Sequence, residues 1–163
     1  MSETAKAKSS VGPLSPHGFD GVKEQAFKVN EATGVFMVNA GLEAIERGMP
    51  DDAFLRRQAA TALDQISRGL NDLKAALNGQ AATPPSRLQA TVFSSGEEKD
   101  ALKAAAADYG ESLGTFLMDA ALARGDVGLP APSDKRSAAI AVEAVGDHLE
   151  ELKRLLGLVA EEA

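Results

Sequence analysis

The sequence predicts a mainly α-helical protein of two tandem repeats, each followed by a long heptad helix, together with a short two-stranded antiparallel ribbon. Three observations support this fold class. The apolar residues are mostly Ala, Leu and Val, with one Tyr and no Trp, which favours helices over a β-sandwich. Residues 87–125 have the pattern of a strand, a helix, a tight turn and a second helix. Most of the remaining chain copies or extends this stretch.

The first half of the chain is predicted to be helical after a flexible segment. Residues 1–18 are expected to be irregular, with a short extended piece near residues 8–11. Helices are predicted over about residues 20–29 and 33–48, and Pro50 prevents the second from continuing. A third helix, to about residue 78, carries apolar residues at alternating steps of four and three: Ala59, Leu63, Ile66, Leu70, Leu73 and Leu77. This heptad pattern predicts another helix alongside.

The second half begins after a proline-containing linker at residues 80–86. Residues 87–93 alternate between apolar and polar side chains, which predicts a half-buried strand. Ser94 or Ser95 then caps a helix that Gly110 breaks, and Ser112 caps the next helix. A last helix, from about residue 134 to residue 159, carries a second heptad pattern: Ala138, Val142, Val145, Leu149, Leu152, Leu156 and Val159.

The two halves are related in sequence. With a shift of 80 residues, residues 22–42 lie over residues 102–122 with seven identities, and with a shift of 79 the two heptad patterns coincide. We therefore predict a duplication, with a first repeat at residues 19–79 and a second at residues 87–160. The strand of the second repeat maps onto a segment that ends in proline, so the first repeat either lost its strand or kept a vestige.

A strand followed at once by two short helices suggests a way to bind DNA. A single strand must pair to be stable, and such a strand typically pairs antiparallel with a second copy of itself. The resulting ribbon fits the major groove, where outward side chains face base edges. The predicted base-reading residues are Arg87, Gln89 and Thr91. The second helix would direct its N-terminus at a phosphate through the Ser112 hydroxyl and the backbone N–H groups of Glu111 and Leu113.

These residues resemble a known superfamily. Residues 87–125 resemble the Arc/CopG/MetJ-type ribbon–helix–helix proteins, and EEKDALKAAAADYGESLGTFLMDAALARG is similar to their plasmid-mobilisation (MobC-like) and antitoxin branches. Residues 66–78 and, more weakly, residues 145–157 resemble the Asn/Leu-rich tail of MobC-like proteins. The resemblance implies a relaxosome accessory protein of plasmid mobilisation or conjugation. Such a protein binds the double-stranded transfer origin and helps a relaxase to nick it, without catalysis of its own.

Composition limits the other functions that we expect. The formal net charge of −7 argues against non-specific coating of nucleic acid, but no Asp or Glu lies between Asp72 and Glu97. The chain has no Cys, and its two histidines, His17 and His148, are far apart in sequence, so we expect no metal site and no cofactor. We also expect no enzyme, because the sequence offers no phosphate loop and no evident nucleophile–His arrangement. No apolar run or leader-like segment is evident, so a cytoplasmic location is expected.

Two other interpretations stay open. The chain could be an antitoxin-like or scaffolding protein that binds a protein partner through its long helices, or a helical bundle with no role on DNA. The partner of the strand at residues 87–93 is either the chain's own N-terminus or a second copy in a homodimer. The heptad helices offer another surface for a homodimer or for a relaxase.

Overall fold

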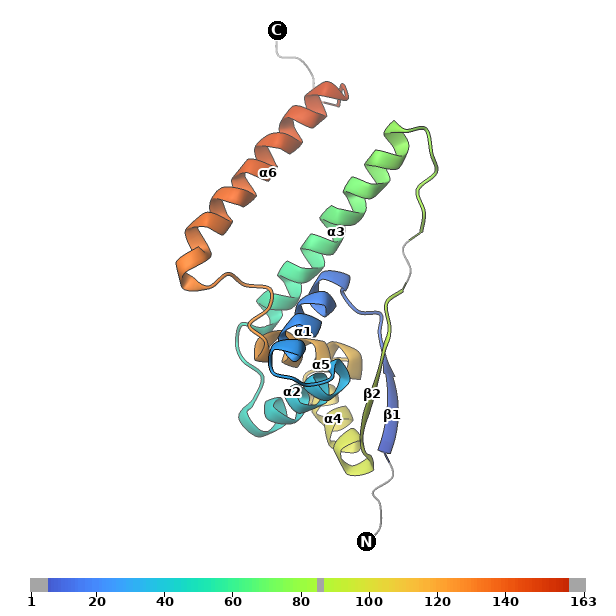
Figure 1. The fold of residues 1–163 in the computed structure, drawn as a ribbon, viewed down its shortest axis with the longest axis vertical. Helices are drawn as coiled ribbons and strands as arrows, with labels where there is room; N and C mark the ends of the chain where they lie inside the picture. The colour runs from blue at the N-terminus through green and yellow to red at the C-terminus, as the bar shows by residue number, and fades with distance from the viewer. Residues whose placement is uncertain (1–5, 85–86, 159–163) are drawn as a thin grey trace. The chain divides into compact units, whose positions relative to one another are not determined.

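The computed structural model describes residues 6–84 and 87–158. This part of the chain is mainly helical, with six α-helices and one two-stranded antiparallel sheet (Figure 1). The predicted mainly α class with a short ribbon is confirmed. The chain divides into two units, Met1–Leu129 and Pro130–Ala163. The boundary falls inside the predicted second repeat, so the first unit holds the first repeat and only the part of the second repeat that precedes its C-terminal helix.

Unit 1 contains two runs of elements in the same order, a strand and then helices. The first run comprises β1 (Lys6–Val11), α1 (Pro16–Lys28), α2 (Thr33–Arg47) and α3 (Ala53–Leu77). The second run comprises β2 (Ala90–Ser95), α4 (Gly96–Asp108) and α5 (Leu113–Arg124). Unit 2 contains a 3₁₀ turn, η1 (Pro132–Asp134), and α6 (Lys135–Leu155). α1 begins before its predicted start because Ser15 caps it and Pro16 occupies its first turn.

The two strands of the ribbon belong to the same chain. β2 pairs antiparallel with β1, with Lys8 opposite Phe93 and Ser10 opposite Thr91. The extended piece expected near residues 8–11 is confirmed and is longer than predicted, because Lys6–Val11 forms a six-residue strand. β2 begins at Ala90, three residues after the predicted start, and continues to Ser95.

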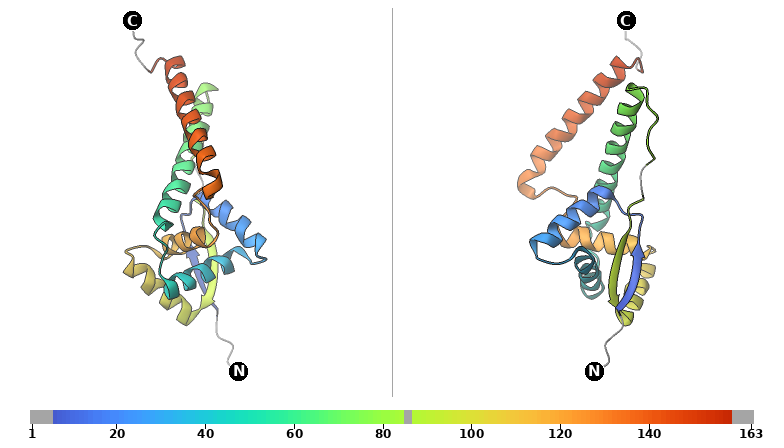
Figure 2. Two further views of the ribbon diagram at one scale, coloured as in Figure 1. Left: turned by 90° about the vertical axis from the view of Figure 1, so that its left-hand side faces the viewer. Right: turned by 45° about the vertical axis from the view of Figure 1, so that its right-hand side comes forward.

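The helices of unit 1 cover one face of the ribbon and leave its other face open (Figure 2). α2 and α5 pack against each other at the centre, with Gly41 at the contact, because a Cβ there would lie 2.7 Å from the side chains of Leu102 and Leu117. The core includes side chains from both runs: Val11, Val22, Phe36, Met37, Val92, Leu102, Phe116, Leu117 and Leu122. Since each run contributes to one core, the two runs fold as one unit.

α3 packs on the rest of unit 1 through a face other than its heptad face. Its buried residues, Ala53, Arg56 and Ala60, lie in the first third of the helix. The heptad residues Leu63, Ile66, Leu70 and Leu77 are 45–62% exposed, so no other helix of unit 1 covers them. α6 of unit 2 likewise buries none of its residues. Among the described residues, no helix is long and apolar enough to cross a membrane.

The shared core leads us to expect that truncating one of its residues destabilises the protein. Phe116 is fully buried and its ring centroid lies 5.8 Å from that of Tyr109, so Phe116→Ala should lower the free energy of unfolding by about 3–5 kcal/mol. Phe27 is 85% exposed, and Phe27→Ala should change the free energy of unfolding by less than about 0.5 kcal/mol. Denaturant unfolding of the full chain measures both. Equal effects would show that the core does not lie where the structure has it.

Candidate nucleic-acid interface

The open face of the ribbon carries polar and basic side chains. Cross-strand partners in an antiparallel ribbon lie on the same face, and the partners Lys8 and Phe93, like Ser10 and Thr91, are exposed. Lys6 is exposed on the same face, whereas Ser9, Val11, Val92 and Ser94 point inward and are buried. The open face therefore presents two lysines, two hydroxyls and an aromatic ring, which we call the ribbon face: Lys6, Lys8, Ser10, Thr91 and Phe93.

The structure changes the predicted set of base-reading residues. Thr91 lies on the ribbon face as predicted, and Gln89 is exposed just before β2 begins. Arg87 lies three residues before the strand and lines a hollow of about 720 Å³ beside α3, so it is not part of the ribbon. Lys6 and Lys8 were not predicted, because β1 was not expected to be a full strand. The periodic exposure of KAKSSV is visible only once its partner is known.

Two helix N-termini flank the ribbon, each against the strand of the other run. Gly114 in the first turn of α5 lies against β1, since a Cβ there would be 3.2 Å from the Gly12 nitrogen and 3.5 Å from Val11 Cβ. Gly34 in the first turn of α2 lies against β2, where a Cβ would be 3.4 Å from the Thr91 carbonyl oxygen. Helix N-termini attract anions through their free N–H groups and their dipole. The ribbon face is thus bordered on both sides by groups that suit phosphates.

The turn before α5 uses two of its predicted phosphate donors internally, the Glu111 backbone N–H and the Ser112 hydroxyl. The Glu111 backbone N–H donates to the Ala106 carbonyl oxygen at 2.9 Å, so it is not free for a phosphate, and this part of the prediction is wrong. The bond closes the C-terminus of α4, where Gly110 takes a φ of 68° that favours glycine. The Ser112 hydroxyl accepts from Thr115 N–H at 3.1 Å and donates to Thr115 Oγ1 at 3.0 Å. Ser112 caps α5 as predicted and is exposed, and Leu113 follows it as the first residue of the helix.

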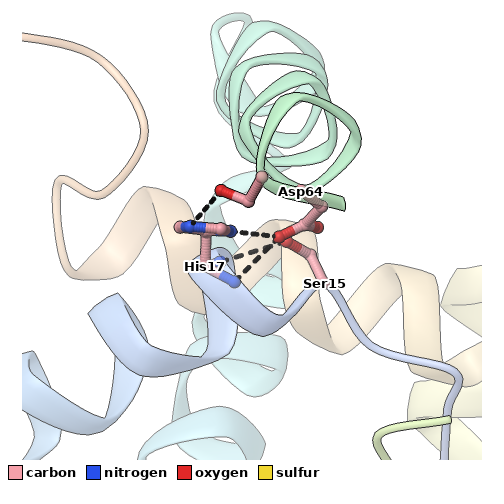
Figure 3. Close-up of polar contacts among 5 residues, drawn as sticks. Ser15, His17 and Asp64 are labelled. Carbon is pink, nitrogen blue, oxygen red and sulfur yellow. Dashed lines mark hydrogen bonds and ion pairs between the residues drawn. The ribbon is translucent and has the colours of Figure 1, made fainter. Parts of the chain in front are cut away.

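A second cluster joins α1 to α3 (Figure 3). Asp64 Oδ1 on α3 accepts from the His17 backbone N–H at 3.0 Å and lies 2.6 Å from His17 Nδ1. With Nδ1–H donating to the Asp64 carboxylate, His17 Nε2 is left to accept from the Ser67 hydroxyl, at 3.2 Å. The expectation that the chain holds no nucleophile–His arrangement is therefore wrong. These residues come from different helices, and no spacing in the sequence indicates that they meet.

A carboxylate, an imidazole and a hydroxyl follow one another in this cluster as in a hydrolase triad, but here they hold the two helices together. Ser67 lies in the interior of α3, where backbone N–H groups bond within the helix, so they cannot form an oxyanion hole beside it. Asp64 instead supplies an acceptor at the first turn of α1, next to Ser15, which accepts from Gly18 N–H at 3.1 Å. The cluster fastens the start of α1 to α3.

Comparison of the chain with protein-family models, with curated proteins and with solved structures found no match. The described residues contain no group of three or more His, Cys, Asp or Glu placed to hold a metal ion. The ribbon and the helices beside it are therefore the features of this chain that bear on its function.

The cluster between α1 and α3 predicts a loss of stability on substitution. Asp64→Ala removes a helix-capping acceptor and a side-chain hydrogen bond, and should lower the free energy of unfolding by about 1–2 kcal/mol. Asp72 lies further along α3 and is exposed, so Asp72→Ala is the matched control and should have little effect. Urea unfolding of both variants measures the difference. An Asp64→Ala protein as stable as the control would contradict the fastening role.

Proposed function

We propose that the chain binds double-stranded DNA by placing the ribbon of β1 and β2 in the major groove. The observation that carries this proposal is the ribbon face, bordered by the N-termini of α2 and α5. The major groove is wide enough for a two-stranded ribbon, and side chains on its outer face then reach base edges. The helix N-termini suit the phosphates at the groove edges.

Each residue of the ribbon face has a partner on DNA that its chemistry favours. Lys6 and Lys8 are suited to guanine acceptors or to phosphates, and Ser10 and Thr91 can donate to or accept from base edges. The exposed ring of Phe93 suits the methyl group of thymine. β1 presents lysines where β2 presents Thr and Phe, so the two ends of the ribbon read different base pairs. The preferred site is therefore asymmetric rather than palindromic.

The proposal extends to the origin of the fold and to its setting. Two ribbon–helix–helix-like repeats in one chain would give one molecule the ribbon that such proteins usually assemble from two. The equal order of elements and the identities at a shift of 80 residues support this duplication. With the resemblance to MobC-like proteins, it supports an accessory role on a transfer origin beside a relaxase, in plasmid mobilisation or conjugation, with no catalysis by this chain.

Salt-titrated binding tests the DNA proposal. The affinity of the full chain for a fluorescently labelled mixed-sequence duplex should fall with salt, and the double substitution Lys6→Ala with Lys8→Ala should reduce the slope of log K against log salt by up to about 1.8. Two lost contacts should weaken binding by about tenfold or more. Lys74 lies in the last turn of α3, away from the ribbon, so Lys74→Ala is the control and should bind like the parent (Figure 1).

Two outcomes would contradict the proposal. One is a chain that binds no duplex at low salt. The other is a double variant that binds as tightly as the Lys74→Ala control, because the ribbon face would then not be the reading surface. The hollow beside α3 contributes no contact in this proposal, so Arg87→Ala should leave the affinity within about twofold of the parent.

The long helices, which an antitoxin-like or scaffolding protein would use for a protein partner, also suit self-association of this chain. The observation that favours it is the heptad face of α3, defined by Leu63, Ile66, Leu70 and Leu77, which is exposed along a helix of 25 residues. We propose a second copy of the chain as its occupant. Ala62, Gly69 and Ala76 border the face on one side, are exposed and carry no charge, and Lys74 is the charged residue on the other side. Two identical faces therefore meet with few like charges between them. A pair of identical faces also closes into a twofold dimer with no surface left over.

Sedimentation tests this second use of the chain. The parent should sediment with twice the mass of one chain, and Leu63→Glu combined with Leu70→Glu should give the mass of one chain, because charges on the heptad face oppose burial. Phe27 is exposed on α1, outside this face, so Phe27→Glu should stay dimeric. A parent of single-chain mass, or a double variant that remains dimeric, would exclude the α3 face as a self-association surface.

A further inference from the structure

A pair of carboxyl groups, one buried and one half-buried, lies behind the N-terminus of α5. Asp119 on α5 is 2% exposed, and Glu111 in the preceding turn lies within hydrogen-bonding reach of it. Arg57 Nη1 on α3 donates to Glu111 Oε1 at 3.1 Å and lies 3.2 Å from Asp119 Oδ2. The other oxygen of each carboxyl, Glu111 Oε2 and Asp119 Oδ1, is buried with no donor among the described residues. Two acids thus share one cation and lack one donor.

A single proton between the two carboxyls removes this conflict. It supplies the missing donor and cancels one of the two negative charges, leaving one negative charge for the one guanidinium. Burial, reinforced by the hydrogen bond and the charge of Glu111, raises the pKa of Asp119 to about 7, while the Arg57 guanidinium acts in the opposite direction. Near neutral pH the pair therefore stands between a form that shares a proton and a form with two carboxylates.

The first run of elements holds an amide where the second holds this acid. With the shift of 80 residues, Asn39 on α2 corresponds to Asp119, and Glu31 corresponds to Glu111. Glu31 accepts from Arg124 Nη1 at 2.7 Å, and hydrogen bonds from Arg124, with a further one from Asn39, hold the pKa of Glu31 below its usual range. An amide is a donor at every pH. Asp119 can donate a hydrogen bond to Glu111, as Asn39 does to Glu31, only while it carries a proton.

Few other charges bear on the pair. On the α3 side, Arg56 is paired with Asp52 and Asp126. On the α2 side, Arg124 at the end of α5 is paired with Glu31 and Glu43. In the part of the chain that the structure describes, no charged side chain of α1, α2, α4 or β1 forms an ion pair with Asp119, which leaves Arg57 as its cation and Glu111 as its acidic neighbour.

We propose that Asp119 is a positioning residue for the turn that presents the α5 N-terminus to a DNA phosphate, and that binding takes up the proton which Asp119 and Glu111 share. This inference rests on the DNA-binding function proposed above. Glu111 directly precedes Ser112, and Arg57 ties this turn to α3. A phosphate at Ser112 and Leu113 adds negative charge next to the pair, which favours its protonated form. Loss of the proton sets two carboxylates against each other and loosens the turn.

The first measurement is the affinity for the labelled duplex as a function of pH at constant ionic strength. In the parent, affinity should fall as pH rises above about 7, by at most tenfold per pH unit, because one proton is taken up. Asp119→Asn installs the amide of the first run and should bind with little pH dependence across that window. Asp72→Asn makes the same chemical change at an exposed position on α3 and should keep the parent profile.

The second measurement needs no DNA. Amide hydrogen exchange of the free full chain compares residues 116–118, the first hydrogen-bonded amides of α5, with residues 36–38 of α2, the matched segment beside Asn39. The protection of the α5 segment relative to the α2 segment should fall as pH rises through about 7 in the parent and stay constant in Asp119→Asn.

The two measurements separate this inference from the function on which it rests. A chain that binds no duplex refutes DNA binding, and the proton uptake with it, while the exchange ratio still decides whether the carboxyl pair positions the turn. Binding that is independent of pH in the parent overturns the proton uptake although DNA binding stands. An exchange ratio that is constant in the parent, or that changes with pH equally in Asp119→Asn, overturns the positioning role of Asp119.

Discussion

The backbone pairing of β1 with β2 is the interaction on which the rest of unit 1 depends. A two-stranded ribbon is marginal by itself, so its inner side chains, Val11 and Val92, must be buried by helices, and both are. The dependence is mutual, because α5 approaches β1 through Gly114 and α2 approaches β2 through Gly34. Each run places its second helix on the strand of the other run. Neither run can therefore bury its own strand alone, and pairing of the strands closes a single core.

Elements specified by local chemistry could be predicted from the sequence. Ser95 and Glu98 form a capping box at the start of α4, Ser112 caps α5, and Gly110 ends α4 with a positive φ. Each of these residues lies within a few positions of the helix end that it specifies. β1 could not be predicted in this way. Its inner face contains Ala7 and Ser9, which give no hydropathic alternation against the lysines outside, and it is a strand because β2 lies beside it. Its lysines were missed for the same reason.

The residues of the candidate site could be predicted only where their position depends on the alternation of inward and outward side chains along the strand. The alternation of β2 places Thr91 outward whatever the bounds of the strand, whereas Arg87 required the strand to begin three residues earlier than it does. Two further features depend on contacts that no spacing encodes. Asp64 meets His17, and Asp119 meets Arg57, only after α3 has docked on α1 and α5. Nothing in the sequence around Asp119 distinguishes it from an ordinary acid on an exposed helix face. Its burial is what raises its pKa.

α3 shows why a heptad pattern predicts an interface without identifying the partner. The helix docks on the other helices of unit 1 through Ala53, Arg56 and Ala60, and Arg56 contributes ion pairs rather than apolar contact. The heptad face lies on another side of the helix, so docking neither uses it nor covers it. Burying a Leu or Ile side chain contributes about 1.5–3 kcal/mol. The four large residues of this face therefore retain a gain in free energy that folding of unit 1 does not use and that packing against a further helix can.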